Sequence, residues 1–226
     1  MSEQSKATEL LRERTQSYYW QLDTMGWSLS KIFGPASEGF LQRLLTIDLK
    51  RLGAGEITRV FILNHRGRCE CSFYLQRDEG ESEAYWALCP PQQGEQLHAL
   101  LERYHFGEAL SWSQQDVALF MAHGEAASKL VSSASVFEPV SQLGAPHLGA
   151  ESVSLALPLE RVQELLSALA DAQLSLAARE DWEQVRLIAG YPEAPSEYHE
   201  AHSPLDWGID GISEGKGCYP GQEVIE

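Results

Sequence analysis

The chain of 226 residues is long enough to bury a core, because 43% of its residues are hydrophobic. Its 33 acidic and 17 basic residues give a formal net charge of −16, which repels a phosphate backbone and argues against nucleic acid as a direct partner. No apolar run reaches the ~18 residues of a membrane helix, and the polar start MSEQSKATELLRER does not resemble a secretory signal. We therefore expect a cytoplasmic protein without a membrane partner.

The first half of the chain alternates strand patterns and helix patterns. Residues 1–23 are polar and only weakly helical, and we expect an N-terminal extension there. The elements predicted next are a strand over 27–33, a helix capped by Ser37, a hairpin of strands 60–63 and 69–75 around an Asn64–Gly67 turn, a strand over 85–89, and a helix that places Leu97, Leu100, Leu101 and Tyr104 on one face.

The second half of the chain continues the same theme. The predicted elements are two short strands between 109 and 121, a helix and a long loop within 122–149, a strand over 152–157, a helix opened by Pro158, a helix over 179–189 that stops at Gly190, and a loop over 191–205. Antiparallel hairpins with covering helices predict an α+β fold.

The eight residues KGCYPGQE (216–223) form the most informative motif. Within it, YPGQ (219–222) has Pro second and Gly third, which is the chemistry of a type II turn. Cys218 precedes this turn, Lys216 can favour its thiolate, and Gly217 leaves the backbone open to a partner. Such a thiol could be a nucleophile, a redox-exchanging group or a contact to a metal cluster, and the alternative is an inert cysteine beside a solvated lysine.

The other cysteines and histidines form weaker patterns. The chain has four cysteines, and in a cytoplasmic protein of this length they predict free thiols. Cys69 and Cys71 are expected to point to one face of a strand as two half-buried cysteines. His199 and His202 lack the helix and the spacing of an HExxH zinc motif, so we predict no metal site.

The run PLDWGIDGISEGKGCYPGQE closely resembles the signature of the YgfZ-type folate-binding proteins, which are relatives of the glycine-cleavage T-protein (aminomethyltransferase). Segments 34–49 and 62–68 also fall where this family has counterparts, as does the segment carrying Arg186, Gly190 and Pro192. The resemblance covers residues 24–226 in the order that the family uses. It implies a T-protein-like α+β fold that binds tetrahydrofolate or a derivative.

The resemblance further implies an accessory factor in iron–sulfur cluster assembly or repair, with iron–sulfur client or assembly proteins as partners. In that family the cysteine of the signature, here Cys218, is the residue most associated with function. Lys216, Tyr219 and Gln222 define its setting. An arginine guanidinium suits the glutamate tail of a folate, and the alternative for each arginine in these segments is a solvated surface position. The arginines in the family-like segments are Arg66, Arg68 and Arg186.

The chain also departs from the T-protein pattern. Ser72 stands where the T-protein has a catalytic aspartate, which disfavours aminomethyl transfer. Members of the family usually continue after the signature into a C-terminal barrel domain, and because this sequence stops at Glu226 we expect either a truncated or a minimal form without that domain. If nothing covers residues 214–226, we expect them to be mobile. Two alternatives therefore remain open: a tetrahydrofolate-dependent one-carbon transferase, and a non-enzymatic interaction scaffold that has lost folate binding.

Overall fold

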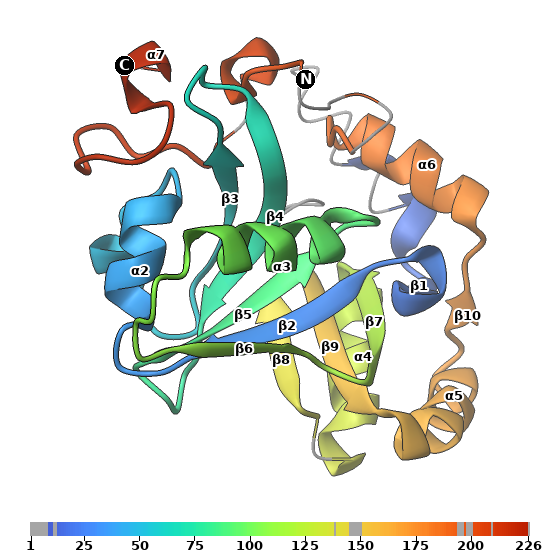
Figure 1. The fold of residues 1–226 in the computed structure, drawn as a ribbon. Coiled ribbons are helices and arrows are strands. Elements are labelled where there is room, and N and C mark those ends of the chain that lie inside the picture. Colours follow the sequence, from blue (N-terminus) through green and yellow to red (C-terminus); the bar gives the residue numbers. More distant parts are fainter. Residues whose placement is uncertain are drawn as a thin grey trace. The chain divides into compact units, whose positions relative to one another are not determined.

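The structure is a computed structural model that describes residues 9–10, 13–137, 139–144, 151–193, 197, 201–208 and 210–225. The chain divides into two compact units, which are coloured by sequence in Figure 1. The first unit comprises Met1–Gly26 and Asp116–Pro192, and the second unit comprises Trp27–Gln115 and Glu193–Glu226. Both units are therefore built from segments that are distant in the sequence.

The first unit is a five-stranded sheet with helices. Its strands, in the order β10-β1-β7-β9-β8, are β10 (Ser175–Leu176), β1 (Tyr18–Gln21), β7 (Val117–His123), β9 (Ser152–Pro158) and β8 (Ser141–Gly144). All strand pairs are antiparallel except β1 with β10. The helical segments are η1 (Asp23–Met25), α4 (Glu125–Ala134), η3 (Ser135–Phe137), η5 (Leu159–Arg161), α5 (Val162–Asp171) and α6 (Arg179–Ile188).

The core of the first unit joins the two central strands to α4 and α5. Leu130 of α4 and Leu165 of α5 are fully buried against Phe120 of β7 and Leu155 of β9. These two leucines lie on the inward faces of their helices, as their spacing predicts. The alternating run SVSLAL forms β9, as predicted, and β9 is buried along nearly its whole length, its two serines included.

Part of the segment 1–23, expected to be an N-terminal extension, is a strand of the first unit: β1 lies within it. Tyr19 of β1 pairs with Ala122 of β7, and Trp20 is 1% exposed. The Trp20 ring packs edge-on against Trp182 of α6, with 5.9 Å between ring centroids. The strand was missed because four residues are too short to show a periodicity of their own. The short strands β8 and β10 were missed for the same reason.

The second unit is a five-stranded antiparallel sheet with α2 and α3 packed on one face (Figure 1). Its strands, in the order β3-β4-β5-β2-β6, are β3 (Ile57–Leu63), β4 (Cys69–Arg77), β5 (Ala84–Cys89), β2 (Ser28–Phe33) and β6 (Ser111–Gln114). The helical segments are α2 (Ser37–Leu44), η2 (Leu49–Arg51), α3 (Gln93–Tyr104), η6 (Pro204–Trp207) and α7 (Gln222–Ile225). The predicted antiparallel α+β architecture is confirmed.

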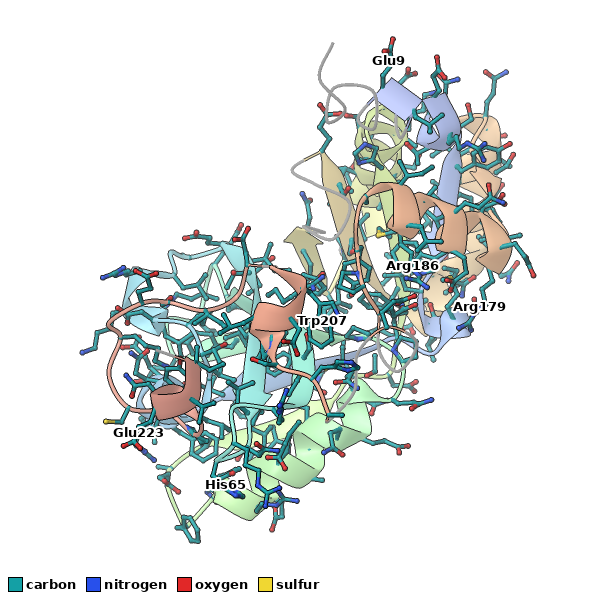
Figure 2. All side chains as sticks on the ribbon, turned by 90° about the horizontal axis from the view of Figure 1, so that it is seen from above. Glu9, His65, Arg179, Arg186, Trp207 and Glu223 are labelled. Atoms are coloured by element: carbon teal, nitrogen blue, oxygen red, sulfur yellow. The ribbon has the colours of Figure 1, made fainter. Side chains whose placement is uncertain are left out.

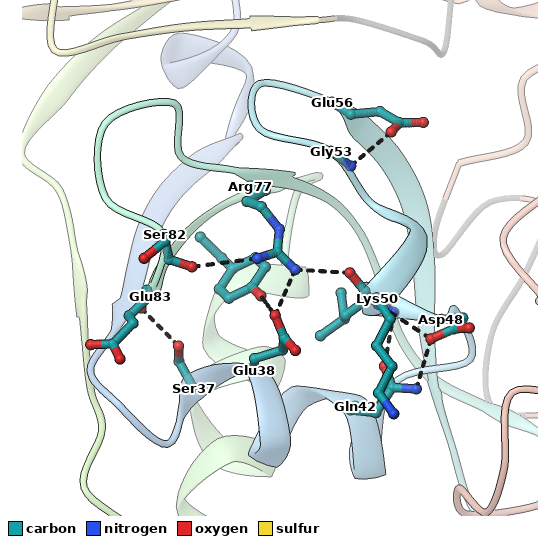
Figure 3. Close-up of polar contacts among 12 residues, drawn as sticks. Ser37, Glu38, Gln42, Asp48, Lys50, Gly53, Glu56, Arg77, Ser82 and Glu83 are labelled. Carbon is teal, nitrogen blue, oxygen red and sulfur yellow. Dashed lines mark hydrogen bonds and ion pairs between the residues drawn. The ribbon is translucent and has the colours of Figure 1, made fainter.

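Helix α2 is attached to the sheet by polar contacts, which Figure 3 shows. Ser37 does not cap the helix as predicted: Ala36 is the N-cap residue, and the Ser37 hydroxyl donates to the carbonyl of Glu83 at 2.7 Å. Arg77 Nη2 donates to Glu38 Oε2 at 2.8 Å. The tertiary partner Glu83, which immediately precedes β5, therefore overrides the local capping preference of serine.

The prediction that Cys69 and Cys71 face the same side of β4 is wrong. Cys71 opposes Ile62 and Cys69 opposes Leu63, so the register shifts there and Glu70 is an extra residue. Such a bulge turns one neighbour to the other face of the sheet. Cys71 lies in the core beneath α2 and α3, whereas Cys69 lies in a separate cluster with Leu63.

Among the described residues, no helix has the length and apolar character that crossing a membrane requires.

Candidate functional site

The turn predicted over residues 219–222 is present. The backbone N–H of Gln222 donates to the carbonyl of Tyr219 at 3.2 Å, which closes the turn. Gly221, at its third position, has a φ of 78°, as a type II turn requires. The local chemistry of YPGQ therefore determines the shape of this part of the signature.

This turn lies against the hairpin turn between β3 and β4. A Cβ added to Gly221 would lie 2.4 Å from the carbonyl oxygen of Asn64 and 2.9 Å from the Cα of Gly67. A Cβ added to Gly67 would in turn lie 3.0 Å from the Cβ of Val224. Gly221 thus allows a backbone approach that a side chain there would prevent, and a side chain at Gly67 would crowd Val224. The two family-like segments, the hairpin turn and the signature, form one continuous site.

Tyr219 fixes the signature to the same sheet. Its side chain is buried in a cluster with Phe61, Leu63 and Cys69. Partly buried hydrophobic residues complete this cluster: Trp207, Ile212 and Ile225. Within the segment 214–226, Tyr219 and Ile225 therefore pack in the second unit, whereas the adjoining Cys218 is exposed. The side chain of Trp207 is labelled in Figure 2.

Upstream of the signature, a buried threonine connects three chain segments. The Thr46 hydroxyl donates to the carbonyl of Gly211 at 2.5 Å and accepts the backbone N–H of Phe61 at 3.1 Å. The Ser213 N–H donates to the Thr46 carbonyl at 2.9 Å, and the Ser213 hydroxyl accepts the N–H of Asp48 at 2.9 Å. Residues 211–213 are therefore held beside residues 46–48, the segment that follows α2.

Lys216 is directed at the C-terminal end of α2. Its ammonium donates to the backbone carbonyls of Gln42, at 2.7 Å, and Leu45. It also lies 5.1 Å from the centroid of the Tyr219 ring. Burial lowers the pKa of Lys216 to about 8, and the negative charge of Asp48 opposes this shift. Since 8 is above neutral pH, the group still carries its charge at pH 7 and complements the negative end of the helix dipole.

Cys218 is the exposed member of the four cysteines, all of which the structure describes. Burial raises the pKa of Cys69 to about 12. It also raises the pKa of Cys71, where the neighbouring thiols add to the effect, and that of Cys89. Because the thiolate is the reactive form, thiol chemistry is confined to the signature.

We expect N-ethylmaleimide to modify one cysteine of the native protein, Cys218. A pKa of about 12 in place of 9 leaves Cys69 with roughly 1000-fold less thiolate at neutral pH. The buried position of Cys69 also limits the access of the reagent to the sulfur. Mass spectrometry of peptides from the native and the urea-unfolded protein measures the sites. The expected result is one adduct in the native protein and four after unfolding. Early labelling of Cys69, Cys71 or Cys89 in the native protein would contradict this assignment.

The predicted folate contacts are divided between the two units. Arg66 and Arg68 are exposed on the hairpin turn, beside the signature, and Arg68 lies 3.7 Å from the carboxylate of Asp206. Arg186 belongs to α6 of the first unit and is 3% exposed. The structure therefore assigns Lys216, Tyr219, Gln222 and the two hairpin arginines to one unit and Arg186 to the other. Arg186 is labelled in Figure 2.

Arg186 has a structural environment of its own. Its Nε donates to Glu183 Oε2 at 2.7 Å, and its Nη1 donates to the carbonyl of Tyr191 at 3.2 Å. These bonds fasten the residues after α6 to the helix. A guanidinium with partners of this kind must exchange them before it can bind a ligand carboxylate.

Ser72 and the candidate metal ligands lie away from the signature turn in the sequence. Ser72 lies on β4, is 2% exposed, and donates its backbone N–H to Gln93 Oε1 at 2.9 Å. No cluster of three or more histidine, cysteine, aspartate or glutamate side chains suited to a metal ion occurs in the described part of the chain. His199 lies outside that part.

Sequence reasoning missed the residues that support the signature: Gln42, Thr46, Asp48 and Ser213. Thr46 and Asp48 lie in a segment that resembles the family, but nothing local indicates their partners. The Thr46 hydroxyl and the Gly211 carbonyl are 165 residues apart in the sequence. A pairing of conserved positions across an alignment is the kind of signal that could have found them.

The two-sheet architecture and the site together define the class of protein. The structure superposes on glycine cleavage system aminomethyltransferase T from Bartonella henselae with a TM-score of 0.80 at 16% identity, over 96% of this chain and 64% of that one. The chain therefore has the T-protein fold.

The similarity in sequence is to a particular member of that class. The chain is 27% identical over 211 residues to the tRNA-modifying protein YgfZ of Cronobacter sakazakii, which covers 88% of this chain and 64% of that protein. It has a YgfZ-type T-protein fold, as the signature predicts. The chain spans just under two thirds of the length of each of these relatives. No protein-family model matches it.

Proposed function

We propose that this chain is a folate-binding accessory factor in iron–sulfur cluster assembly or repair, and that it acts through Cys218. The observation that carries the proposal is the exposed thiol in a turn that is held from both sides, while the other three cysteines are buried. A thiolate is a soft ligand that suits the iron of a cluster. The cluster belongs to a client protein and is the cargo of the reaction.

The partner that we propose is a protein. The similar YgfZ of Cronobacter sakazakii is named for tRNA modification. A net charge of −16 repels the phosphates of RNA, so direct binding of tRNA by this chain is disfavoured. A contribution to tRNA modification therefore passes through a client enzyme.

The proposed folate contacts are Arg66 and Arg68 for the glutamate tail, with Lys216, Tyr219 and Gln222 in the adjoining signature. The T-protein fold and the YgfZ-type sequence support this choice. Arg186 is proposed as a further contact from the first unit. Arg66 and Arg68 are the most accessible of this set, and their substitution disturbs the least structure.

The proposal is tested by the reactivation of an enzyme whose [4Fe–4S] cluster has been damaged by oxidant. With ferrous iron, sulfide and a thiol reductant present, the chain is expected to accelerate recovery of the client's activity, and tetrahydrofolate is expected to increase the effect. Cys218→Ser should abolish the acceleration, because a hydroxyl is a poor ligand for cluster iron. Glu102→Gln, an exposed change on α3 and outside the signature, is the matched control and should behave as wild type.

Anaerobic titration with tetrahydrofolate, followed by tryptophan fluorescence, tests the folate site in the same samples. Exchanging Arg66 and Arg68 together for alanine should weaken binding about 100-fold, since each charged hydrogen bond contributes about 1.5 kcal/mol, or about tenfold. The matched control is Arg103→Ala, which removes an exposed arginine on α3. No binding up to millimolar folate would favour the interaction scaffold. One-carbon transfer from methylene-tetrahydrofolate would favour the transferase.

A further inference from the structure

Cys218 lies in a very short loop between two fixed points. Lys216 is attached to α2 through the carbonyls of Gln42 and Leu45, and Tyr219 is buried against β3 and β4. The Lys216 ammonium also faces the Tyr219 ring, at 5.1 Å from its centroid. The side chains on either side of the loop thus contact each other, and Gly217 and Cys218 are the two residues between them.

Gly217 gives this loop its shape. Its φ is 100°, a conformation that residues with a side chain rarely adopt, and a Cβ at this position would meet nothing within 4 Å. There is therefore open space beside Gly217 among the described residues, and the neighbouring Cys218 is exposed. The ends of the loop, rather than its own contacts, determine where the thiol lies.

The lysine end of the loop is part of a polar group that we call the latch: Gln42, Asp48, Ser213 and Lys216. Gln42 Nε2 donates to Asp48 Oδ1 at 3.0 Å, a contact drawn in Figure 3. The Asp48 N–H donates to Ser213 Oγ at 2.9 Å. The Gln42 carbonyl accepts from Lys216. The latch thus holds residues 213–216 at two points. Ser213 is bonded to Asp48 in the segment that follows α2, and Lys216 is bonded to Gln42 at the end of α2.

We propose that Lys216 is a positioning residue, which holds the Cys218 loop through the latch instead of acting on the thiol by its charge. Two of the three N–H bonds of its ammonium are directed to carbonyls at the C-terminal end of α2. The positive charge is thereby matched by the negative end of the helix. The proposal deepens the proposed function, because it concerns the same thiol.

Variants distinguish positioning of the Cys218 loop from an electrostatic effect of Lys216 on the thiol. Lys216→Met removes both the tether and the charge. Ser213→Ala removes one hydrogen bond of the latch and leaves the charge in place. Lys216→Arg keeps a cation that can donate to both carbonyls. Lys31→Met, which removes a lysine paired with Glu81 on the surface, is the matched control.

The first measurement is the rate at which Glu-C protease cleaves after Glu214, an exposed residue inside the held segment. When opening is fast, this rate follows the population of the open segment. We expect about a tenfold increase for Lys216→Met, since a charged hydrogen bond contributes on that scale. The expected increase is smaller for Ser213→Ala, and none is expected for Lys31→Met. Lys216→Arg should recover most of the loss.

The second measurement is the pH dependence of Cys218 alkylation at fixed temperature. The positioning role predicts that the midpoint of the pH–rate profile is the same in wild type, Lys216→Met and Ser213→Ala. A midpoint that moves to higher pH in Lys216→Met alone, without faster cleavage in Ser213→Ala, would overturn the proposal and restore the electrostatic role. Neither readout requires folate or a cluster, so the proposed function can fail while this inference stands.

Discussion

Replacing Gly221 by alanine is expected to lower the free energy of unfolding of the second unit by about 2–4 kcal/mol. A φ of 78° costs a residue with a side chain about 1–2 kcal/mol, and the new Cβ would lie 2.4 Å from the carbonyl oxygen of Asn64. That oxygen belongs to backbone, so the contact is relieved only if the signature leaves the hairpin turn. Urea unfolding followed by tryptophan fluorescence measures the loss.

Gly215→Ala is the matched control for this experiment. Gly215 has a φ of 66°, and a Cβ there would meet nothing within 4 Å. Its substitution should therefore cost only the conformational term, about 1 kcal/mol. If both variants lost the same amount of stability, the close packing of the signature on the hairpin turn would be refuted. In Gly221→Ala the Cys218 loop loses one of its two fixed ends, so reactivation of a client should also fall.

Trp20→Ala is expected to destabilise the first unit by about 3–5 kcal/mol, the usual cost of removing a buried tryptophan. Trp20 is 1% exposed, and its edge-on contact with Trp182 adds to the loss. The result also tests whether β1 belongs to the fold, because a substitution in a separate extension would not lower the stability of the first unit by this amount. Thermal unfolding of the purified variant by circular dichroism provides the measurement.

The comparison for Trp20 is Tyr18→Ala on the same strand. Tyr18 is 42% exposed, so its loss should cost about 1 kcal/mol or less. A Trp20→Ala protein as stable as Tyr18→Ala would show that β1 is an appendage, as the sequence had indicated. A large difference would show that an N-terminal truncation before residue 24 damages the first unit.

The Gly221 result concerns the signature, and the Trp20 result concerns the first unit. The hairpin turn, the burial of Tyr219 and the latch all lie within the second unit, so this unit contains the whole support of the thiol. The first unit contributes Arg186, the proposed folate contact that already has partners. Loss of folate binding in an Arg186 variant therefore has to be compared with the stability of the first unit before it is assigned to lost contact.

The sequence by itself determined the elements whose signals are local. The leucine spacing in α3 predicts a helix with Leu97, Leu100 and Leu101 inward, and all three are fully buried. Turn residues placed the hairpin between β3 and β4, and YPGQ predicted the turn of the signature. The signature also identified the YgfZ-type T-protein fold. The helix and turn predictions rest on residues close together in the sequence, whereas the family resemblance rests on the signature together with further segments along the chain.

The tertiary structure alone decided where the ends of the signature are held. Lys216 and the Gln42 carbonyl are 174 residues apart, and no local pattern specifies such a pair. The bulge at Glu70 is likewise invisible in the sequence, yet it sends Cys69 and Cys71 to different clusters. Propensity and spacing describe a chain over a few residues, whereas these contacts arise only when the whole unit packs and buried polar groups must find partners.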